Sequence, residues 1–269
     1  MTDILLEIAK NKREEVASQF PTLQSKDAYI ESSRKTHKET RSLASIIRKK
    51  NAEGLPGVIA EFKRRSPSKG DIAPMCGVTE VVKAYQQGGA AACSVLTDTR
   101  YFGGALSDLA VARQELSIPI LRKDFIIDQV QIAEARIYDA DIILLIASLL
   151  EPSQINDYYA LARELGLEVL LEIHSPQELE RINFTPEIIG VNNRSLSTFH
   201  TDVNHSVKLF EILPVEPLKI AESGIKSPND VERLIEIGYN GFLIGETFMR
   251  ASSPLEEVKS YTTVTRCLK

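Results

Sequence analysis

The sequence predicts an α/β protein built as a (β/α)8 barrel with a helical extension at its N-terminus. Two patterns predict this fold: short apolar, β-rich runs recur along the chain, and helical segments separate them. The length of 269 residues agrees, because one such barrel takes roughly 250 residues. We therefore expect one domain over residues 1–269, with the extension in residues 1–57 and the barrel in residues 58–269.

Eight apolar runs are the candidate barrel strands. Each is apolar throughout rather than alternating, as expected of parallel strands that are covered on both faces. Eight strands that alternate with helices predict an all-parallel sheet, and closing that sheet gives a TIM barrel. An open doubly wound sheet is the alternative. The runs are residues 58–62, 92–97, 119–123, 142–146, 168–173, 188–193, 218–223 and 241–245.

Helical segments and their end signals lie between these runs. Ser175 and Ser227 each precede a proline, which places a capping hydroxyl just before the first turn of a helix. Glycines follow two of the segments, at Gly88 and Gly166, and mark their C-terminal ends. The predicted helices cover residues 78–87, 106–116, 151–165 and 247–250.

The first 57 residues lie outside the repeat. A spacing of four residues predicts an amphipathic helix over residues 3–18, with Thr2 or Asp3 as its N-cap. The residues that recur are Ile4, Ile8, Lys12 and Val16. A second helix is predicted over residues 42–50. We expect the charged residues of both helices to form solvated faces.

Composition restricts the classes of partner. A formal net charge of −5 disfavours nucleic acid, because phosphate backbones select basic surfaces. No apolar run approaches the roughly 20 residues that cross a bilayer, and the N-terminus lacks a signal-peptide pattern. We therefore expect a cytoplasmic monomer with no membrane contact and no obligate protein partner. Cys76, Cys93 and Cys267 lack metal-ligand spacing, which predicts unpaired thiols and no metal site.

Charged and polar side chains gather at the predicted carboxyl ends of the strands, which form the active-site face of such a barrel. Residues two apart, such as Glu61 and Lys63, share a face of their strand. Clustered acids and bases shift each other's pKa values, so the group as a whole predicts proton-transfer catalysis. Its members are Glu61, Lys63, Lys123, Glu172, Asn192, Arg194, Glu222 and Ser223.

A phosphate site is predicted in the last two loops. Gly224 and Gly245 let a phosphate approach the backbone, and the short helix after Gly245 offers free N–H groups. We expect the Glu246 carboxylate to point away while its backbone makes the contact. The segment 66–70 follows Arg64 and Arg65 and is either a mobile cover over an anionic ligand or an ordinary basic loop.

Six motifs in register resemble the indole-3-glycerol phosphate synthase family. Residues 61–68 match that family's E-x-K-x-x-S-P-S pattern, and residues 121–125 match its L-x-K-D-F pattern. Segments 171–173, 190–194, 221–225 and 243–246 follow in the family's order, and Tyr101-Phe102-Gly103-Gly104 also fits. The resemblance covers nearly the whole chain, including the N-terminal extension.

The resemblance implies a reaction in tryptophan biosynthesis that needs no metal or organic cofactor. The substrate would be 1-(2-carboxyphenylamino)-1-deoxyribulose 5-phosphate, and the products indole-3-glycerol phosphate, CO2 and water. Lys123 matches the general acid for ring closure and Glu172 the base for dehydration. Lys63 matches the residue that holds the substrate carboxylate and assists loss of hydroxide, and Glu61 orients it. Binding roles would fall to Asn192, Arg194, Glu222 and Ser223, phosphate contacts to Ser66, Gly224, Gly245 and Glu246, and contact with the anthranilate ring to Phe102.

Three other functions remain as alternatives. Phosphoribosylanthranilate isomerase chemistry needs a cysteine base at the end of the first strand, where this chain has Glu61 and Lys63. A Schiff-base aldolase would use Lys123 or Lys63 as its nucleophile. A non-catalytic sensor of a phosphorylated ligand would not need both lysines and Glu172. We also expect Arg122, as an added cation, to lower the pKa of Lys123.

Overall fold

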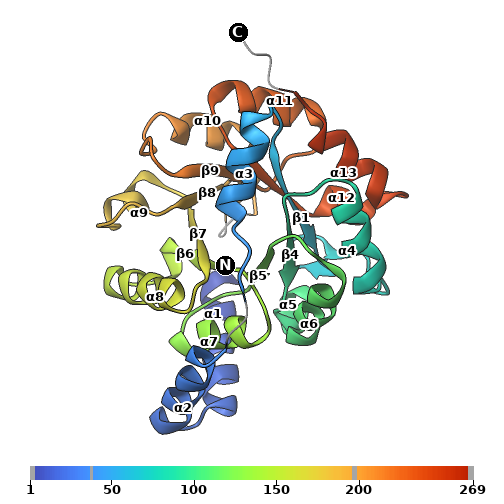
Figure 1. Cartoon of the computed structure of the whole chain (residues 1–269). Coiled ribbons are helices and arrows are strands. Elements are labelled where there is room, and N and C mark those ends of the chain that lie inside the picture. The colour runs from blue at the N-terminus through green and yellow to red at the C-terminus, as the bar shows by residue number, and fades with distance from the viewer. Residues whose placement is uncertain (1–3, 37–38, 196–198, 266–269) are drawn as a thin grey trace.

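A closed barrel of eight parallel strands forms the centre of the computed structural model, which describes residues 4–36, 39–195 and 199–265 (Figure 1). Around the barrel the order is β1-β10-β9-β8-β7-β6-β5-β4. Closure confirms the predicted barrel and excludes the open sheet. Each strand lies within one residue of its predicted bounds: β1 (Gly57–Phe62), β4 (Ala92–Leu96), β5 (Ile120–Lys123), β6 (Ile142–Ile146), β7 (Glu168–Ile173), β8 (Ile188–Asn192), β9 (Leu218–Glu222) and β10 (Gly241–Ile244).

Helices surround the barrel, and the predicted ones are present. A two-stranded hairpin, β2 (Arg65–Ser66) and β3 (Gly70–Asp71), follows β1, and a short 3-10 helix (Ala147–Leu149) follows β6. The helices of the first half are α1 (Ile4–Gln19), α2 (Leu23–Arg34), α3 (Leu43–Ala52), α4 (Val78–Gln87), α5 (Thr99–Phe102), α6 (Leu106–Glu115) and α7 (Gln129–Ile137). Those of the second half are α8 (Pro152–Glu164), α9 (Pro176–Glu180), α10 (Asn204–Phe210), α11 (Pro228–Ile237), α12 (Glu246–Arg250) and α13 (Pro254–Thr262).

Side-chain caps fix several helix starts. Ser175 accepts a hydrogen bond from the backbone N–H of Glu178, and Ser227 accepts one from Asp230, as predicted. The candidate caps Thr2 and Asp3 lie outside the described residues. Helix α2 was not predicted, although Thr22 caps it through the N–H of Ser25. This helix is polar and packs against α7 outside the barrel, so its sequence carries only a weak apolar stripe.

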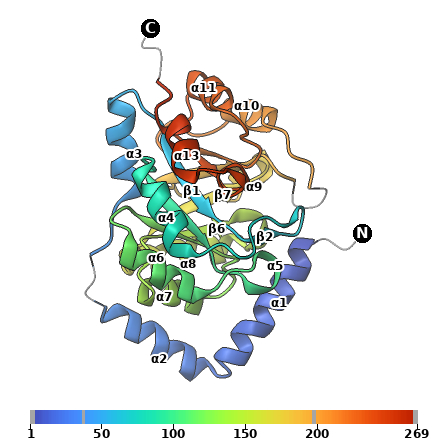
Figure 2. The same ribbon diagram turned by 90° about the vertical axis from the view of Figure 1, so that its right-hand side faces the viewer.

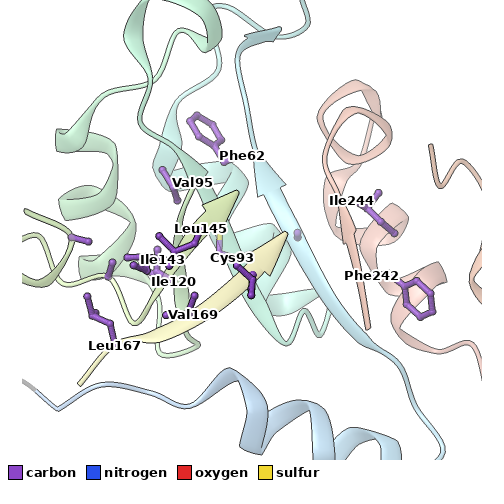
Figure 3. Packing of buried hydrophobic residues seen from close by; sticks show 14 of the residues in the cluster. Phe62, Cys93, Val95, Ile120, Ile143, Leu145, Leu167, Val169, Phe242 and Ile244 are labelled. Carbon is purple, nitrogen blue, oxygen red and sulfur yellow. The ribbon is translucent and has the colours of Figure 1, made fainter. Parts of the chain in front are cut away.

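Two hydrophobic layers hold the barrel together, because successive strand residues face opposite sides. The outer layer lies between strands and helices and includes Val95, Ile143 and Phe242 (Figure 3). The inner layer fills the barrel and includes Ile59, Leu121, Leu170 and Ile220. Burial on both faces explains why the strands are continuously apolar.

The N-terminal extension closes both ends of the barrel. Leu43 and Ile47 of α3 belong to the inner layer, as do Leu5 and Ile8 of α1. Figure 2 shows α3 and α1 at opposite ends of the barrel, with α2 running between them along the outside. The carboxylate of Glu168 holds α3 in place by accepting hydrogen bonds from the Ser42 hydroxyl and the Leu43 N–H at the start of that helix.

One charged residue of α1 is buried, contrary to the expected solvated face. Lys12 Nζ lies 3.1 Å from Asp98 Oδ2 and 3.1 Å from Asp124 Oδ1. Asp98 follows β4 and Asp124 follows β5, so the lysine ties α1 to two adjacent strand ends. Burial alone would lower the pKa of Lys12, but Asp124 and Asp98 outweigh that effect and raise it.

We predict that Lys12→Met lowers the free energy of unfolding by about 3 kcal/mol, because it leaves the buried carboxylate of Asp98 without its cation and removes one of the two cations beside Asp124. Denaturant unfolding of the two proteins measures the difference. Lys10→Met changes an exposed lysine of the same helix and should leave stability nearly unchanged. Equal stability of the two variants would contradict the anchoring role of Lys12.

Candidate active site

A cavity of about 370 Å³ opens at the carboxyl ends of the barrel strands. All of the predicted site residues except Ser66 line it. Strand alternation explains this convergence, since Glu61, Lys123, Glu172 and Glu222 each lie two residues after a member of the inner apolar layer. The apolar layer is therefore the floor of the cavity, and the charged side chains stand directly on it.

Lys123 lies between two acidic side chains. Its Nζ donates to Glu222 Oε2 at 2.7 Å and to Glu172 Oε2 at 3.2 Å. Burial alone would lower the pKa of Lys123, but the negative charges of Glu222, Glu172 and Glu61 outweigh it and raise that pKa above its usual value. The group is therefore an ammonium at neutral pH.

The predicted effect of Arg122 on Lys123 is wrong. Neighbouring residues of a strand face opposite sides, so Arg122 points out of the barrel. Its guanidinium lies 3.1 Å from Asp124 Oδ2 and 3.0 Å from Glu134 Oε2, and it is almost fully buried there. These carboxylates neutralise Arg122, and the pKa of Lys123 is raised rather than lowered.

Glu172 and Glu222 share one ammonium but differ in their protonation. Burial would raise the pKa of Glu172, but Lys123 and His174 outweigh it and lower that pKa, so Glu172 is a carboxylate. Burial raises the pKa of Glu222 to about 7, and the neighbouring charge of Glu172 adds to this rise. The pair therefore presents one ionised group beside one that titrates near neutrality.

Glycines make room for two of the carboxylates. A Cβ atom on Gly190 would lie 2.2 Å from Glu222 Oε1, and one on Gly245 would lie 2.4 Å from Glu61 Oε1. Glu61 in turn pairs with the ammonium of Lys63. Gly190 was part of a predicted motif but had no predicted role. The need for glycine in a strand becomes clear only when the side chain packed against it, here Glu222, is known.

Gly224, Gly245 and Glu246, which were predicted to contact phosphate, lie at the end of the cavity near β9 and β10. Ser223 and Gly224 have positive φ angles of 67° and 78°, so the chain turns sharply there. Three further cationic side chains also line the cavity: Lys226 and Arg250, which had no predicted role, and Lys69, which belongs to the segment 66–70 that was offered as a cover over an anionic ligand. The Glu246 carboxylate lies 3.2 Å from Arg250 Nε and 3.8 Å from Lys69 Nζ.

The segment 66–70 reaches the opposite wall. Arg194 donates through Nη1 to Ser68 Oγ at 3.1 Å, which joins this segment to the loop after β8. Ser66 is buried beside the cavity, and its Oγ has no hydrogen-bond partner among the described residues. Arg64 pairs with Asp108 instead of facing the cavity, so it does not contribute to an anion site.

Apolar side chains cover the remaining wall. The predicted Phe102 lies there with its ring centroid 5.9 Å from that of Phe125. Ile4, Leu5 and Ile8 of α1 also line the cavity, so the extension forms part of the site. Their spacing predicted a helix, but their contribution to the cavity wall becomes evident only from the packing of that helix over the strand ends.

The described residues contain neither a metal-ligand cluster nor a helix that could span a membrane. Within the described ranges, no group of three or more His, Cys, Asp or Glu side chains could hold a metal ion. None of the helices in residues 4–36, 39–195 and 199–265 is long and apolar enough to cross a membrane. Cys76 and Cys93 are free thiols, and Cys267 lies outside the described residues.

Comparison with known proteins gives one family. Residues 5–261 match the model of a family described as indole-3-glycerol phosphate synthase. A relative of that name from Bacteroides thetaiotaomicron is 46% identical over 261 residues, covering 97% of this chain and 98% of the relative. Another from Laribacter hongkongensis is 42% identical over 256 residues, covering 94% of this chain and 97% of the relative.

A solved structure supports the fold alone. The thiamine phosphate pyrophosphorylase from Pyrococcus furiosus superposes with a TM-score of 0.57 at 16% identity, covering 77% of this chain and 93% of that one. The family match and the near-full-length relatives go further, and they agree with a barrel whose strand ends converge on one acid–base cluster. The chain belongs to the indole-3-glycerol phosphate synthase family, whose members are carboxy-lyases of tryptophan biosynthesis.

Proposed function

We propose that Lys123 and Glu172 carry the principal proton transfers by which this chain converts 1-(2-carboxyphenylamino)-1-deoxyribulose 5-phosphate into indole-3-glycerol phosphate, CO2 and water. The observation that carries this proposal is the position of the Lys123 ammonium, which lies within 3.2 Å of both Glu172 and Glu222 in the cavity. An ammonium and a carboxylate in contact supply an acid and a base in one place.

Ring closure needs a proton donor at the ketone oxygen of the substrate. As the aromatic carbon attacks the carbonyl carbon, negative charge develops on that oxygen, and Lys123 donates a proton to it. The new bond interrupts the conjugation of the ring, and loss of CO2 restores it. Lys63 holds the leaving carboxylate, and Glu61, in contact with Lys63, orients it.

Dehydration completes the indole. Lys63 assists the departure of hydroxide, which leaves as water, and Glu172 removes the proton from the neighbouring carbon. The lowered pKa of Glu172 supports this role, because a base must be ionised before the step begins.

Binding of the small phosphorylated substrate uses the rest of the cavity. We assign the polar positioning contacts to Asn192, Arg194, Glu222 and Ser223, and contact with the anthranilate ring to Phe102. We assign the phosphate to Ser66, Gly224, Gly245 and the backbone of Glu246. The orphaned hydroxyl of Ser66 supports this assignment, and Lys69, Lys226 and Arg250 supply positive charge at that end.

The alternative functions are less well supported. A Schiff-base nucleophile must be a neutral amine, whereas the raised pKa of Lys123 keeps it charged. Neither Cys76 nor Cys93 lines the cavity, so a cysteine base is missing from its described wall. A sensor would have no use for an ion-paired acid and base.

Because one chain supplies the whole proposed site, we infer that it acts as a monomer. A cytoplasmic location stays a prediction.

We predict that Lys123→Ala and Glu172→Gln each lower kcat by roughly 100-fold or more, because each removes a positioned proton-transfer group. The fluorescence of the indole product measures turnover. Lys83→Ala on the outer helix α4 is the control and should behave as wild type. A folded wild-type protein that binds the substrate without forming product would contradict the proposal and favour a sensor.

We predict a fall in kcat/KM as the pH rises through about 7, where Glu222 loses its proton. Above that pH, Lys123 faces two carboxylates and gives up its proton less readily. A pH–rate profile should show this limb in the wild type and lack it in Glu222→Gln. If the limb persists unchanged in the variant, another group is responsible.

A further inference from the structure

His174 contacts the oxygen of Glu172 that Lys123 leaves free. It lies two residues after Glu172, at the end of β7, and its Nε2 is 3.5 Å from Glu172 Oε1. The other oxygen of the same carboxylate, Oε2, is 3.2 Å from Lys123 Nζ. The imidazole and the ammonium therefore lie on opposite oxygens of one carboxylate.

The other ring nitrogen faces a second carboxylate. His174 Nδ1 lies 3.8 Å from Glu178 Oε2, and Glu178 is held there because the same oxygen accepts the His174 backbone N–H at 2.8 Å. The backbone carbonyl of His174 contacts His205 Nε2 at 2.8 Å. Both ring nitrogens are buried, and neither has a closer hydrogen-bond partner among the described residues.

A second cavity of about 450 Å³ has this histidine in its wall and shares Leu5, Asn192 and Arg194 with the active-site cavity. His174 lines it but does not line the active-site cavity, whereas Glu172 lines the active-site cavity but not this one. The exposed residues Ser148 and Lys208 form part of its wall, so the cavity reaches the protein surface. His174 thus separates the proposed base from a second route to solvent.

The proposed reaction consumes one proton in each turnover. At neutral pH the substrate carboxylate leaves as uncharged CO2, and the hydroxyl leaves as water, so charge balance requires the uptake of one proton in each turnover. In the proposed steps Lys123 gives a proton to the ketone oxygen and Glu172 removes one from carbon. The departing hydroxide, held by Lys63, takes up the proton from Glu172 and leaves as water, so Glu172 is again a carboxylate and Lys123 is one proton short.

We propose that His174 carries this proton from the second cavity to Glu172. This inference rests on the proposed roles of Glu172 and Lys123. The protonated imidazole loses its Nε2 proton to Glu172 Oε1, and the neutral ring then regains one proton from the second cavity, which restores its N–H bond. Glu172 then passes the proton to Lys123.

The charges around His174 favour the protonated form of its imidazole. Burial alone would lower the pKa of His174, but Glu178 and Glu172 outweigh it and raise that pKa above its usual value. Glu222 adds to this rise from β9. The other charged or titratable groups on the packed elements are Lys123 on β5, Arg194 and His200 after β8, Asp202 before α10, and His205 and Lys208 on α10.

Two rates in His174→Gln test the proposal. With enzyme in excess, the first turnover uses the proton already on Lys123 and should stay near the wild-type rate. Steady-state kcat should fall by about tenfold or more, because each later turnover waits for a proton. In His174→Ala, added imidazole should restore kcat in proportion to its concentration.

Lys208→Gln is the matched control, since it removes a charge from the same cavity without contacting Glu172, and its kcat should equal that of the wild type. An unchanged kcat in both His174 variants overturns the proposal. Equal losses in the first turnover and in kcat also overturn it, as does a loss that imidazole does not reduce. Glu172→Gln separates the two ideas: a normal first turnover in that variant refutes the role of Glu172 and the relay that rests on it, whereas a lost first turnover there with an unchanged kcat in the His174 variants refutes the role of His174 alone.

Discussion

The buried ammonium of Lys123 is the interaction on which the rest of the active site depends. An ion taken out of water costs several kcal/mol unless it is paired and hydrogen-bonded, and Lys123 is paired with both Glu172 and Glu222. Two carboxylates around one ammonium leave an excess of negative charge, which one of them relieves by holding a proton near neutrality. The chemistry of the cavity thus follows from the cost of burying three ionisable groups together.

The parts of the fold around Lys123 hold this cluster in place and keep it dry. Arg122 and Asp124 flank the lysine in sequence and are fixed by ion pairs of their own, so the backbone at residue 123 has little freedom. Asp124 also receives Lys12, which brings α1 over the cavity. The apolar side chains of α1 then cover the charged cluster, and the low local polarity strengthens its interactions.

The strands and most of the candidate site residues could be predicted from the sequence alone. Strands buried on both faces are uniformly apolar, and parallel strands all end on one rim, so residues far apart in the chain could be placed together without knowing any contact. Features that depend on partners distant in the chain were missed. Helix α2 is evident only from its packing on α7. The buried position of Lys12 depends on two aspartates of other loops. The proposed role of His174 depends on the second cavity, which it lines. The expectation for Arg122 failed because it ignored strand alternation.

The closure of the barrel by its own N-terminal extension has a consequence for the order in which the chain folds. The anchor of α3 is Glu168, 126 residues after Ser42, and α1 is held by residues at the ends of β4 and β5. During synthesis, α1 and α3 therefore leave the ribosome before the strands that hold them in place. Helix α3 must wait for Glu168 until more than half of the barrel has been synthesised, and α1 must wait with its apolar stripe exposed until β4 and β5 are complete. The same hydrophobic residues that later cover the substrate are thus, for that interval, the surface at greatest risk of misassembly.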